Sequence, residues 1–384
     1  MHSASKINTS TQIKVGITGQ AGFIGTHLYN YLGLKQNITH IPFEDAFYNS
    51  QSALQKFVAE CDVIVHLAAM NRHNEPDVLY DTNIRLVRQL IEAMESEKVI
   101  PHLIFSSSTQ EEMDNPYGKS KKEGRLLFTE WAKRSKASFT GLVIPNVYGP
   151  FGHPFYNSVI ATFCHQLSHG EEPQIHIDNE LKLIYVGELV EEIYDCIAQG
   201  RTDTITLLSI PYTSIKKVSK ILELLMSYRK NYFEQGIFPS LSDSFERNLF
   251  NTYVCYIDVK SHFPRPLTLH SDERGSFTEI AKLVSGGQVS FSTTKPGITR
   301  GDHFHTRKAE RFAVIKGKAR IQLRRIGTSE VFSFDLDGER PAYVDMPVWY
   351  THNIANTGKK DLYTIFWISE HFNSDDPDTY FEKV

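Results

Sequence analysis

The chain has 384 residues, a length that predicts two domains because a single hydrophobic core rarely grows so large. Hydrophobic residues make up 41% and charged residues 22% of the chain, as in globular proteins, and this composition excludes a mainly disordered chain. The formal net charge is −4 and no extended basic block occurs, so nucleic acid is not an expected partner and a small polar ligand is favoured.

The N-terminal residues 1–12 (MHSASKINTSTQ) are polar and lack the apolar core of a signal peptide, so we expect a disordered tail there. No stretch approaches the roughly 18 apolar residues needed to span a bilayer. The four cysteines are far apart and form no CxxC pair, which predicts neither a thiolate zinc site nor a disulfide framework. We therefore expect a cytoplasmic protein without a membrane partner.

The first half of the chain alternates strand and helix patterns. Residues 13–18 (IKVGIT) are typical of a strand, and Thr26–Leu34 of a helix. Asp62–Ala68 and Leu103–Ser106 are continuous apolar runs, as in buried parallel strands, and Asn83–Ser96 between them has helical spacing. This repetition predicts an α/β Rossmann-type domain with a doubly wound parallel sheet.

The pattern changes after about residue 250, where Gly and Pro separate short alternating segments. Such segments predict a C-terminal all-β barrel or jelly roll. The expected strands are Ser276–Ile280, Val289–Thr293, Phe312–Ile315, Ala319–Leu323, Val331–Phe334, Tyr343–Asp345 and Leu362–Ile368. The segment 214–250 has a helical pattern and is expected to dock the two parts. We place one domain at residues 13–250 and the other at 251–384.

A glycine-rich turn follows the first strand directly. Gly19, Gly22 and Gly25 are spaced as GxxGxxG, and the residues between the last two, Phe23 and Ile24, begin the helix. In a dinucleotide-binding turn such glycines allow a tight turn, a close approach of the backbone to the pyrophosphate and close helix packing, with the phosphates at the positive end of the helix. These five residues are the expected cofactor contacts.

The sequence indicates the type of nicotinamide cofactor less directly than it indicates the dinucleotide-binding turn. Glu44 and Asp45 stand about 20 positions past the turn, where an acidic residue usually binds the ribose diol of NAD. A solvated loop is an equally good interpretation of these two residues. The phosphate of NADP would need His40, Arg72 or backbone N–H groups, since no arginine precedes Arg72.

A Tyr/Lys pair indicates hydride-transfer chemistry. Tyr117 and Lys121 are spaced i,i+4, so they share one face of a helix that starts after Pro116. A lysine ammonium stabilises a phenolate and lowers the pKa of the phenol, which then exchanges protons more readily at neutral pH. Ser108 ends a serine run after a strand, where its hydroxyl can hydrogen-bond a carbonyl oxygen.

Together these motifs resemble the extended short-chain dehydrogenase/reductases of the sugar-nucleotide epimerase and dehydratase group. The matching motifs are GxxGxxG at Gly19–Gly25, DxxxHLAA at Asp62–Ala69, Asn83, SSS at Ser106–Ser108, YxxxK at Tyr117–Lys121 and PNVYGP at Pro145–Pro150. The resemblance implies that the tyrosine transfers the proton, the lysine binds the nicotinamide ribose and the serine polarises the carbonyl. It also implies cofactor contacts at Leu67, Ala68 and Asn83.

Two features depart from that family. The stretch between Ser108 and Tyr117 is shorter than usual, so Thr109 or Met113 is an alternative neighbour of the substrate, and Ile144 stands where an arginine commonly precedes the PN motif.

A second set of chemically active side chains lies near the C-terminus. His303 and His305 share one face of an expected strand, Glu310 returns on the next, and His352 follows on a later strand. Imidazoles with one carboxylate predict a divalent metal site, with zinc favoured and nickel, manganese or iron also compatible. The pattern resembles the cupin superfamily, with Trp349 where that family usually has glycine, a change expected to reshape the pocket mouth.

The whole chain resembles the CapF-type capsular polysaccharide biosynthesis enzymes. The resemblance rests on YNSVIATFC (Tyr156–Cys164), DERGSFTE (Asp272–Glu279), KPGIT (Lys295–Thr299), the THNI segment around His352 and PDTYF (Pro377–Phe381). It implies a bifunctional homodimer whose cupin domain epimerises C3 of a UDP-2-acetamido-2,6-dideoxy-4-hexulose. The reductase domain then reduces the C4 ketone with NADPH to a UDP-N-acetyl-6-deoxy-L-talosamine.

The family resemblance thus favours NADP over the NAD that Glu44 and Asp45 suggest. Candidate proton carriers for the epimerisation are Tyr350, Asp302 and, if it does not bind the metal, His305. Two alternatives stay open: an NAD-retaining 4,6-dehydratase or C4-epimerase with a structural cupin, and a cupin that acts as a sugar-sensing or assembly module.

Overall fold

The computed structural model describes residues 12–200, 204–272, 275–278, 280, 282–283, 286–370 and 373–384. Residues 1–11 of the expected tail lie outside this described part. By its packing the chain divides into a first unit, Met1–Tyr148 with Leu181–Ile215, and a second unit, Gly149–Glu180 with Lys216–Val384. The two compact units are defined by packing, whereas the domains predicted at residues 13–250 and 251–384 are defined by sequence pattern. The predicted domain division therefore stays a prediction.

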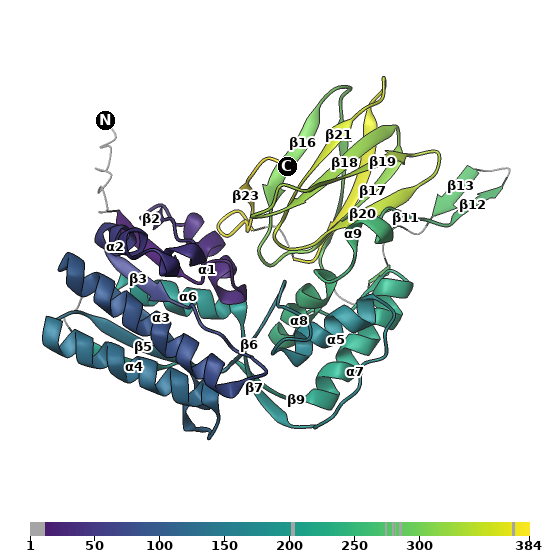
Figure 1. The fold of residues 1–384 in the computed structure, drawn as a ribbon. Helices are drawn as coiled ribbons and strands as arrows, with labels where there is room; N and C mark the ends of the chain where they lie inside the picture. The colour runs from purple at the N-terminus through teal and green to yellow at the C-terminus, as the bar shows by residue number, and fades with distance from the viewer. Residues whose placement is uncertain are drawn as a thin grey trace, which may run out of the picture. The chain divides into compact units, whose positions relative to one another are not determined.

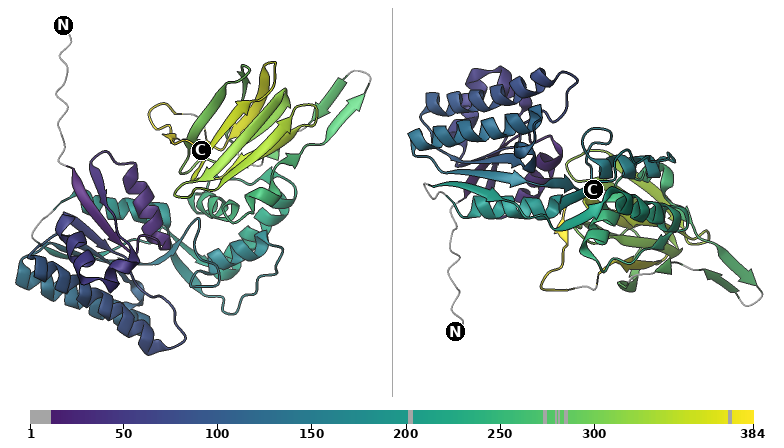
Figure 2. Two further views of the ribbon diagram at one scale, coloured as in Figure 1. Left: turned by 45° about the horizontal axis from the view of Figure 1, so that its top comes forward. Right: turned by 90° about the horizontal axis from the view of Figure 1, so that it is seen from below.

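The first unit is built on a six-stranded parallel sheet with strand order β2-β1-β3-β4-β5-β8. Its strands are β1 Ile13–Thr18, β2 Ile38–Ile41, β3 Val63–His66, β4 His102–Ser108, β5 Phe139–Ile144 and β8 Ile205–Ser209. The central strands β3 and β4 are buried along nearly their whole length because helices cover both faces of the sheet (Figure 2). The predicted doubly wound sheet is confirmed.

The helices of this unit pack in two groups, α2 with α3 and α4, and α1 with α6. They are α1 Phe23–Gly33, α2 Gln51–Glu60, α3 Pro76–Glu97, α4 Pro116–Ser135 and α6 Val186–Ala198, with 3-10 turns η1 Asp45–Asn49 and η2 Thr109–Glu112. A small sheet in the order β6-β7-β9 is formed by β6 Asn146–Tyr148, β7 Glu180–Tyr185 and β9 Ser214–Lys217. No helix in the described part of the chain is both long and apolar enough to cross a membrane.

The second unit contains two antiparallel five-stranded sheets that enclose an apolar core (Figure 1). One has the order β11-β20-β17-β22-β15: Arg265–Pro266, Ala342–Met346, Glu310–Lys316, Leu362–Ile368 and Gln288–Thr294. The other has the order β19-β18-β21-β16-β23: Val331–Asp337, Lys318–Arg325, Tyr350–Asn356, Thr299–Phe304 and Tyr380–Phe381. This arrangement confirms the predicted all-β barrel.

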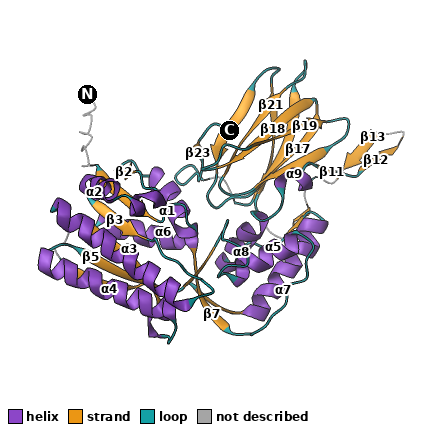
Figure 3. Cartoon of the chain, in the orientation of Figure 1, coloured by secondary structure: helices purple, strands orange, loops and turns teal. Residues whose placement is uncertain are grey.

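Helices and short strands complete the second unit (Figure 3). They are α5 Val159–Ser168, α7 Val218–Tyr228, the π-helix η3 Arg229–Glu234, α8 Ser244–Val254 and α9 Val259–His262. The hairpin β12 Leu269–Asp272 and β13 Gly275–Thr278 and the pair β10 Ile237–Phe238 and β14 Lys282–Leu283 are two-stranded sheets. The predicted helical segment 214–250 is therefore helical in α7, η3 and α8 and extended in β9 and β10.

Candidate functional site

The turn between β1 and α1 carries the three predicted cofactor glycines. Gly19 has a φ of +71°, which glycine adopts without steric cost, and its carbonyl accepts a hydrogen bond from Gly22 N at 3.0 Å. A Cβ on Gly25 would lie 2.2 Å from the Gly19 oxygen, so glycine is needed for this close helix start. Phe23 and Ile24 occupy the first helical turn, where N–H groups have no acceptor within the helix. The turn therefore fits an anionic diphosphate.

The segment after β3 borders this turn. A Cβ on Gly19 would lie 2.7 Å from Ala68 N and 3.1 Å from the Leu67 carbonyl carbon. Asn83 is buried in α3, where its Oδ1 accepts from Met70 N at 2.7 Å and its Nδ2 donates to Met70 O at 3.0 Å. The structure thus brings Leu67 and Ala68 to the glycine turn and makes Asn83 a support for the loop that follows them.

Three serines at the end of β4 have different hydrogen bonds. Ser106 Oγ donates to His66 O at 3.3 Å, and Ser107 Oγ donates to the Glu111 carboxylate. Ser108 Oγ accepts a backbone N–H from η2 at 3.2 Å, a bond that does not use its own hydrogen. Among the described contacts, Ser108 is thus the serine whose hydroxyl hydrogen is not directed at a protein acceptor, which agrees with its predicted role as a donor to a carbonyl.

Tyr117 and Lys121 lie in the first two turns of α4, with the spacing that the sequence predicts. Asn115 caps this helix, since its Oδ1 accepts from Gly118 N at 2.8 Å. Lys121 Nζ donates to Ser106 O at 2.8 Å and lies 5.7 Å from the centre of the Tyr117 ring. The helix start, the serine strand and the ammonium group are therefore held together.

Burial changes the acidity of this lysine. Desolvation lowers the pKa of Lys121 from 10.5 to about 8, and the negative charge of Glu111 opposes this shift. The ammonium form still predominates at neutral pH, so the side chain keeps a positive charge near the Tyr117 phenol. That charge favours the phenolate and makes the phenol a better proton donor.

Glu111 belongs to none of the motifs recognised in the sequence, and it is buried, with 7% of its surface exposed. Its carboxylate accepts from Arg125 Nη2 at 2.7 Å and Arg125 Nε at 2.9 Å, besides the bond from Ser107. The sequence indicates only half of this pair, because Arg125 continues the i,i+4 series of Tyr117 and Lys121 along α4, whereas nothing local identifies Glu111 as its partner. The pair fixes the end of β4 to the helix that carries the Tyr/Lys pair.

The residues considered for the adenosine end of the cofactor lie after β2. Glu44 and Asp45 are exposed where η1 begins. His40 stacks on Tyr29 with 4.0 Å between ring centres, and burial lowers the pKa of His40 below 6.5. His40 is therefore uncharged at neutral pH, which leaves Arg72 or backbone N–H groups as the predicted partners of a 2′-phosphate.

The four predicted metal ligands meet inside the barrel. His303 lies on β16, His305 directly follows it, Glu310 begins β17 and His352 lies on β21, opposite His303 in the strand register. One donor atom from each residue lies within 4.8 Å of all the others. His305 Nε2 and His352 Nε2 are 3.1 Å and 3.0 Å from Glu310 Oε2.

The ligand atoms of this cluster present lone pairs, as a cation-binding site requires. His352 Nδ1 lies 3.2 Å from Tyr350 O, and because a carbonyl only accepts, Nδ1 carries the hydrogen and Nε2 presents its lone pair. His305 Nε2, His352 Nε2 and Glu310 Oε2 are buried and have no hydrogen-bond partner in the described structure. Buried lone pairs that face one another are satisfied by a divalent ion, so these residues fit a metal.

The charges of the cluster agree with this. Burial lowers the pKa of His303 to about 4, with further contributions from His352 and His305. Burial disfavours ionisation of Glu310, but the adjacent His305 and His352 rings outweigh it and lower the pKa of the carboxyl group. A neutral imidazole and an ionised carboxylate are the forms that bind metals.

Trp349 occupies the position where cupins usually have glycine, and the backbone explains that preference. Its φ is +63°, in the left-handed region, and its N–H donates to His305 O at 2.7 Å. The indole is 7% exposed and stacks on Phe304 with 5.5 Å between ring centres. Phe304 points away from the face that carries His303 and His305, because side chains alternate along a strand. The tryptophan packs against Phe304, and the expectation that it reshapes the pocket mouth stays a prediction.

The other two candidate proton carriers, Asp302 and Tyr350, differ in their surroundings. Asp302 Oδ1 accepts from Asn353 Nδ2 at 2.8 Å, and Asn353 alternates with His352 along β21, so both point away from the metal-ligand face. Tyr350 is buried in the apolar core of the second unit, where desolvation raises the pKa of its phenol.

Models of two protein families match this chain, one in its N-terminal part and one in its C-terminal part. A model of the NAD dependent epimerase/dehydratase family matches residues 15–205, and a model of the polysaccharide biosynthesis C-terminal domain matches residues 270–380.

Individual relatives match both parts together. A UDP-2-acetamido-2,6-beta-L-arabino-hexul-4-ose reductase from Pseudomonas aeruginosa is 33% identical over 370 residues, 96% of this chain and 98% of that protein. The crystal structure of capsular polysaccharide assembling protein CapF from Staphylococcus aureus has 35% identity and a TM-score of 0.61, covering 96% of this chain and 100% of that one. The structure of RMD from Pseudomonas aeruginosa complexed with NADPH shares the fold, with 18% identity and a TM-score of 0.51 over 57% of this chain and 82% of that chain.

Both parts of the chain are thus matched in order, and two relatives align over nearly their full length. The chain belongs to the CapF-type family, in which an extended short-chain dehydrogenase/reductase domain is followed by a cupin domain.

Proposed function

We propose that this protein carries out two consecutive steps on one nucleotide sugar. The cupin domain epimerises C3 of a UDP-2-acetamido-2,6-dideoxy-4-hexulose, and the reductase domain reduces the C4 ketone to a UDP-N-acetyl-6-deoxy-L-talosamine for surface polysaccharide. One observation carries the proposal: a single chain holds a Ser/Tyr/Lys set and a dinucleotide turn in its first unit and a largely buried three-histidine, one-glutamate cluster in its second. The relative named as a hexul-4-ose reductase supports the substrate class.

In the reduction, hydride and proton are added to the C4 carbonyl. NADPH, when bound at the glycine turn, supplies the hydride to C4. The Tyr117 phenol gives its proton to the carbonyl oxygen, and Lys121 stabilises the resulting phenolate by its charge. Ser108 directs its hydroxyl hydrogen at the same oxygen and favours the charge that develops there.

In the epimerisation, the proton on C3 leaves from one face of the sugar and returns to the other, so there is no net oxidation. The C4 carbonyl acidifies this proton, and the intermediate carries negative charge on its oxygen. His303, His305, Glu310 and His352 would hold a divalent ion, with zinc as first choice. The ion would supply positive charge that compensates the charge of this intermediate.

The proposal includes the cellular context. NADP is the proposed cofactor, the active form is a homodimer, and the protein acts in the cytoplasm. The four cysteines form no disulfide in the structure, which agrees with a reducing compartment.

The test separates the two steps on one protein. UDP-4-keto-6-deoxy sugar is incubated in heavy water with NADPH or NADH, and NMR follows deuterium at C3 and the reduced product. The variant with His305→Ala and Glu310→Ala is expected to lose deuterium incorporation and to keep reduction of a substrate already epimerised at C3.

Two outcomes would contradict the proposal. Persistent exchange in the double variant would make the cupin a structural or sugar-sensing module. Near-stoichiometric NAD in the purified protein, with no net NADPH oxidation, would indicate a 4,6-dehydratase or C4-epimerase.

A further inference from the structure

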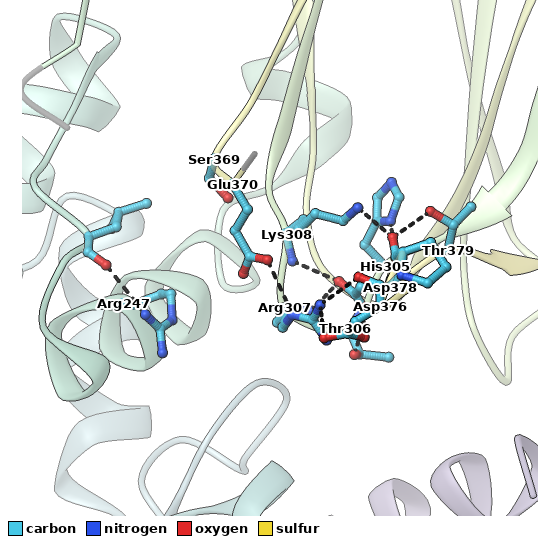
Figure 4. A network of polar contacts seen from close by, with 12 residues as sticks. Arg247, His305, Thr306, Arg307, Lys308, Ser369, Glu370, Asp376, Asp378 and Thr379 are labelled. Atoms are coloured by element: carbon cyan, nitrogen blue, oxygen red, sulfur yellow. Dashed lines mark hydrogen bonds and ion pairs between the residues drawn. The ribbon is translucent and has the colours of Figure 1, made fainter. Parts of the chain in front are cut away.

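The C-terminal segment 376–382 is tied to the part of the barrel that carries two of the metal-ligand histidines. Asp378 is the centre of this attachment, with a side chain 2% exposed and a φ of +39°. Its Oδ1 accepts from Thr306 N at 3.0 Å and Thr306 Oγ1 at 2.7 Å. Its Oδ2 accepts from Arg307 N and Lys308 N, both at 3.1 Å. One carboxylate therefore organises the whole turn between β16 and β17 (Figure 4).

The backbone of the same residue contacts a metal ligand. The Asp378 carbonyl oxygen lies 2.5 Å from His305 Nδ1. A carbonyl oxygen cannot donate, so Nδ1 carries the ring hydrogen and Nε2 of His305 presents its lone pair. That Nε2 is the atom 3.1 Å from Glu310 Oε2. The Asp378 carbonyl thus selects the tautomer and the ring orientation that a metal requires.

Neighbouring bonds fix the position of this carbonyl. Lys308, 4% exposed, donates from Nζ to Pro377 O at 2.5 Å, and Thr379 Oγ1 donates to the same oxygen at 2.9 Å. Further on, β23 pairs with β16, and Glu382 N donates to Asp302 O at 2.9 Å. The segment is therefore held on both sides of Asp378.

His352 provides an internal comparison. Its Nδ1 bonds the carbonyl of Tyr350, two residues away on the same strand. His305 instead depends on a carbonyl 73 positions away in the sequence. Loss of the C-terminal attachment therefore affects His305 and leaves His352 oriented by its own strand.

We propose that Asp378 is a positioning residue of the metal centre: its side chain anchors the C-terminal segment to the β16–β17 turn so that its carbonyl orients His305. The inference rests on the proposed metal site at His303, His305, Glu310 and His352. Asp378 touches neither metal nor substrate and acts through His305.

The experiment measures zinc affinity of the full-length protein by competition with a chromophoric chelator, with zinc alone as the probe. Asp378→Ala is expected to weaken zinc binding about 10- to 100-fold, as loss of an outer partner of a metal-bound histidine typically does. Asp378→Asn tolerates positive φ and keeps the acceptor for Thr306, but its amide nitrogen cannot accept from Arg307 N and Lys308 N, so it should restore only part of the affinity. Asp376→Ala is the matched control, because it removes a carboxylate of the same segment that pairs with Arg307 at the surface, and should leave affinity unchanged.

A second readout is independent of the metal. Nitrogen NMR of the metal-free, histidine-labelled protein should show His305 protonated at Nδ1 in the wild type and a mixture of tautomers in Asp378→Ala. Thr306→Val removes one of the four bonds without disturbing the fold, and should weaken zinc binding about two- to tenfold.

The outcomes distinguish the two claims. A wild-type protein that binds no zinc would refute the metal site, and the tautomer measurement would still decide the role of Asp378. Unchanged zinc affinity and an unchanged His305 tautomer in Asp378→Ala and Thr306→Val would overturn the positioning role.

Discussion

Lys121 combines a positive charge with complete burial, and this combination is energetically unfavourable without compensation. Its Nζ has a hydrogen bond to Ser106 O and a cation–π contact with Phe105, 5.2 Å from the ring centre. These contacts and the charge of Glu111 only partly replace water, because the pKa still falls to about 8. The buried Lys121 ammonium group thus lowers the free energy of unfolding, although the proposed reduction needs its positive charge.

This predicts a pH dependence of folding. The pKa of Lys121 is about 8 in the folded protein and 10.5 in the unfolded chain, so between these values the unfolded chain binds more protons. Stability of the cofactor-free protein should therefore fall as pH decreases from 10.5 to 8 and show no further Lys121 contribution below 8. The full contribution is roughly 3 kcal/mol.

Urea unfolding at pH 7.5 and 10.5 measures this effect. Lys121→Met should be more stable than the wild type at pH 7.5, and the gain should vanish at pH 10.5. Lys119→Met, at an exposed lysine paired with Asp114, is the control and should follow the wild type. A pH-independent gain in Lys121→Met would contradict the assignment.

A second prediction concerns Tyr117. Tyr117→Phe removes the proton donor and keeps the ring, so kcat for ketone reduction should fall about 10²- to 10⁴-fold while NADPH affinity stays within a factor of about three. Stopped-flow reduction and nucleotide fluorescence titration measure the two quantities. A kcat close to the wild-type value would assign the proton to another group.

At this scale the sequence predicts well which residues face one another through regular spacing. Tyr117 with Lys121, and His303 with His305, follow from helix and strand periodicity alone. The Glu111–Arg125 pair and the Asp378–His305 bond connect different elements, so their partners depend on tertiary packing. The choice of Ser108 among three serines became supported only when the bonds of the other two were known.

Between β20 and β21, one residue with an uncommon backbone conformation determines where β21 begins. Trp349 turns the chain into β21 with a left-handed backbone, and Ile326 N donates to its carbonyl at 2.9 Å. The stacking on Phe304 offsets the steric cost of a positive φ, which is about 1–2 kcal/mol for a residue other than glycine.

The two contributions can be separated by substitution. Trp349→Ala should destabilise the protein by about 3–5 kcal/mol through lost packing, and Trp349→Gly by about 1 kcal/mol less because glycine accepts the backbone freely. Chemical denaturation of both variants tests this order, which is the reverse of the usual preference for alanine. Equal or greater loss with glycine would show that the backbone conformation is unimportant here.

Strong periodicity identified most elements but placed their ends less well. The helix expected at Asn83–Ser96 begins earlier in the structure, at Pro76, where a proline suits the first turn. The β6-β7-β9 sheet was not predicted, because its strands are short and two of them are charged at their ends. Residues 273, 274 and 279 of the DERGSFTE motif lie outside the described structure.

In the second unit, helices and barrel share a buried ionic network. Arg311 of β17 binds Asp345 of β20 through Nε at 2.7 Å and Nη2 at 2.9 Å, and its Nη1 donates to Gly236 O at 3.0 Å. Tyr232 of η3 donates to Asp345 at 2.6 Å. Arg311 and Asp345 are 2% and 3% exposed, so each depends on the other for its charge.

Breaking this network should be costly. Asp345→Ala leaves the Arg311 charge buried without its partner and should destabilise the second unit by about 3–5 kcal/mol. Replacing the whole set, with Arg311→Met, Asp345→Leu and Tyr232→Phe together, should restore stability to within about 2 kcal/mol of the wild type. Denaturant unfolding followed by Trp367 fluorescence measures both. A mild effect of Asp345→Ala would mean that water reaches the arginine.

This network joins residues that lie before and after the predicted domain boundary near residue 250. Composition and periodicity change there, and those are the signals that a sequence offers. Tyr232 and Gly236 precede the predicted boundary, yet they bond to strands of the barrel. Such bonds join residues more than 70 positions apart, which no local pattern encodes.

The two units are built from alternating segments of the chain, and this arrangement has a consequence during synthesis. The first unit receives its last sheet strand, β8, at Ser209, whereas residues 149–180 belong with a barrel that is completed only near the C-terminus. Helix α5 of this earlier segment packs on α7, η3 and α8, the last of which ends at Val254, so at roughly 5–20 residues per second it waits about 4–17 seconds for these partners. Its side chains Ile160, Phe163 and Leu167 are buried in the finished protein. We therefore expect this apolar face of α5 to be open to chaperones on the nascent chain until α7 and α8 have been synthesised.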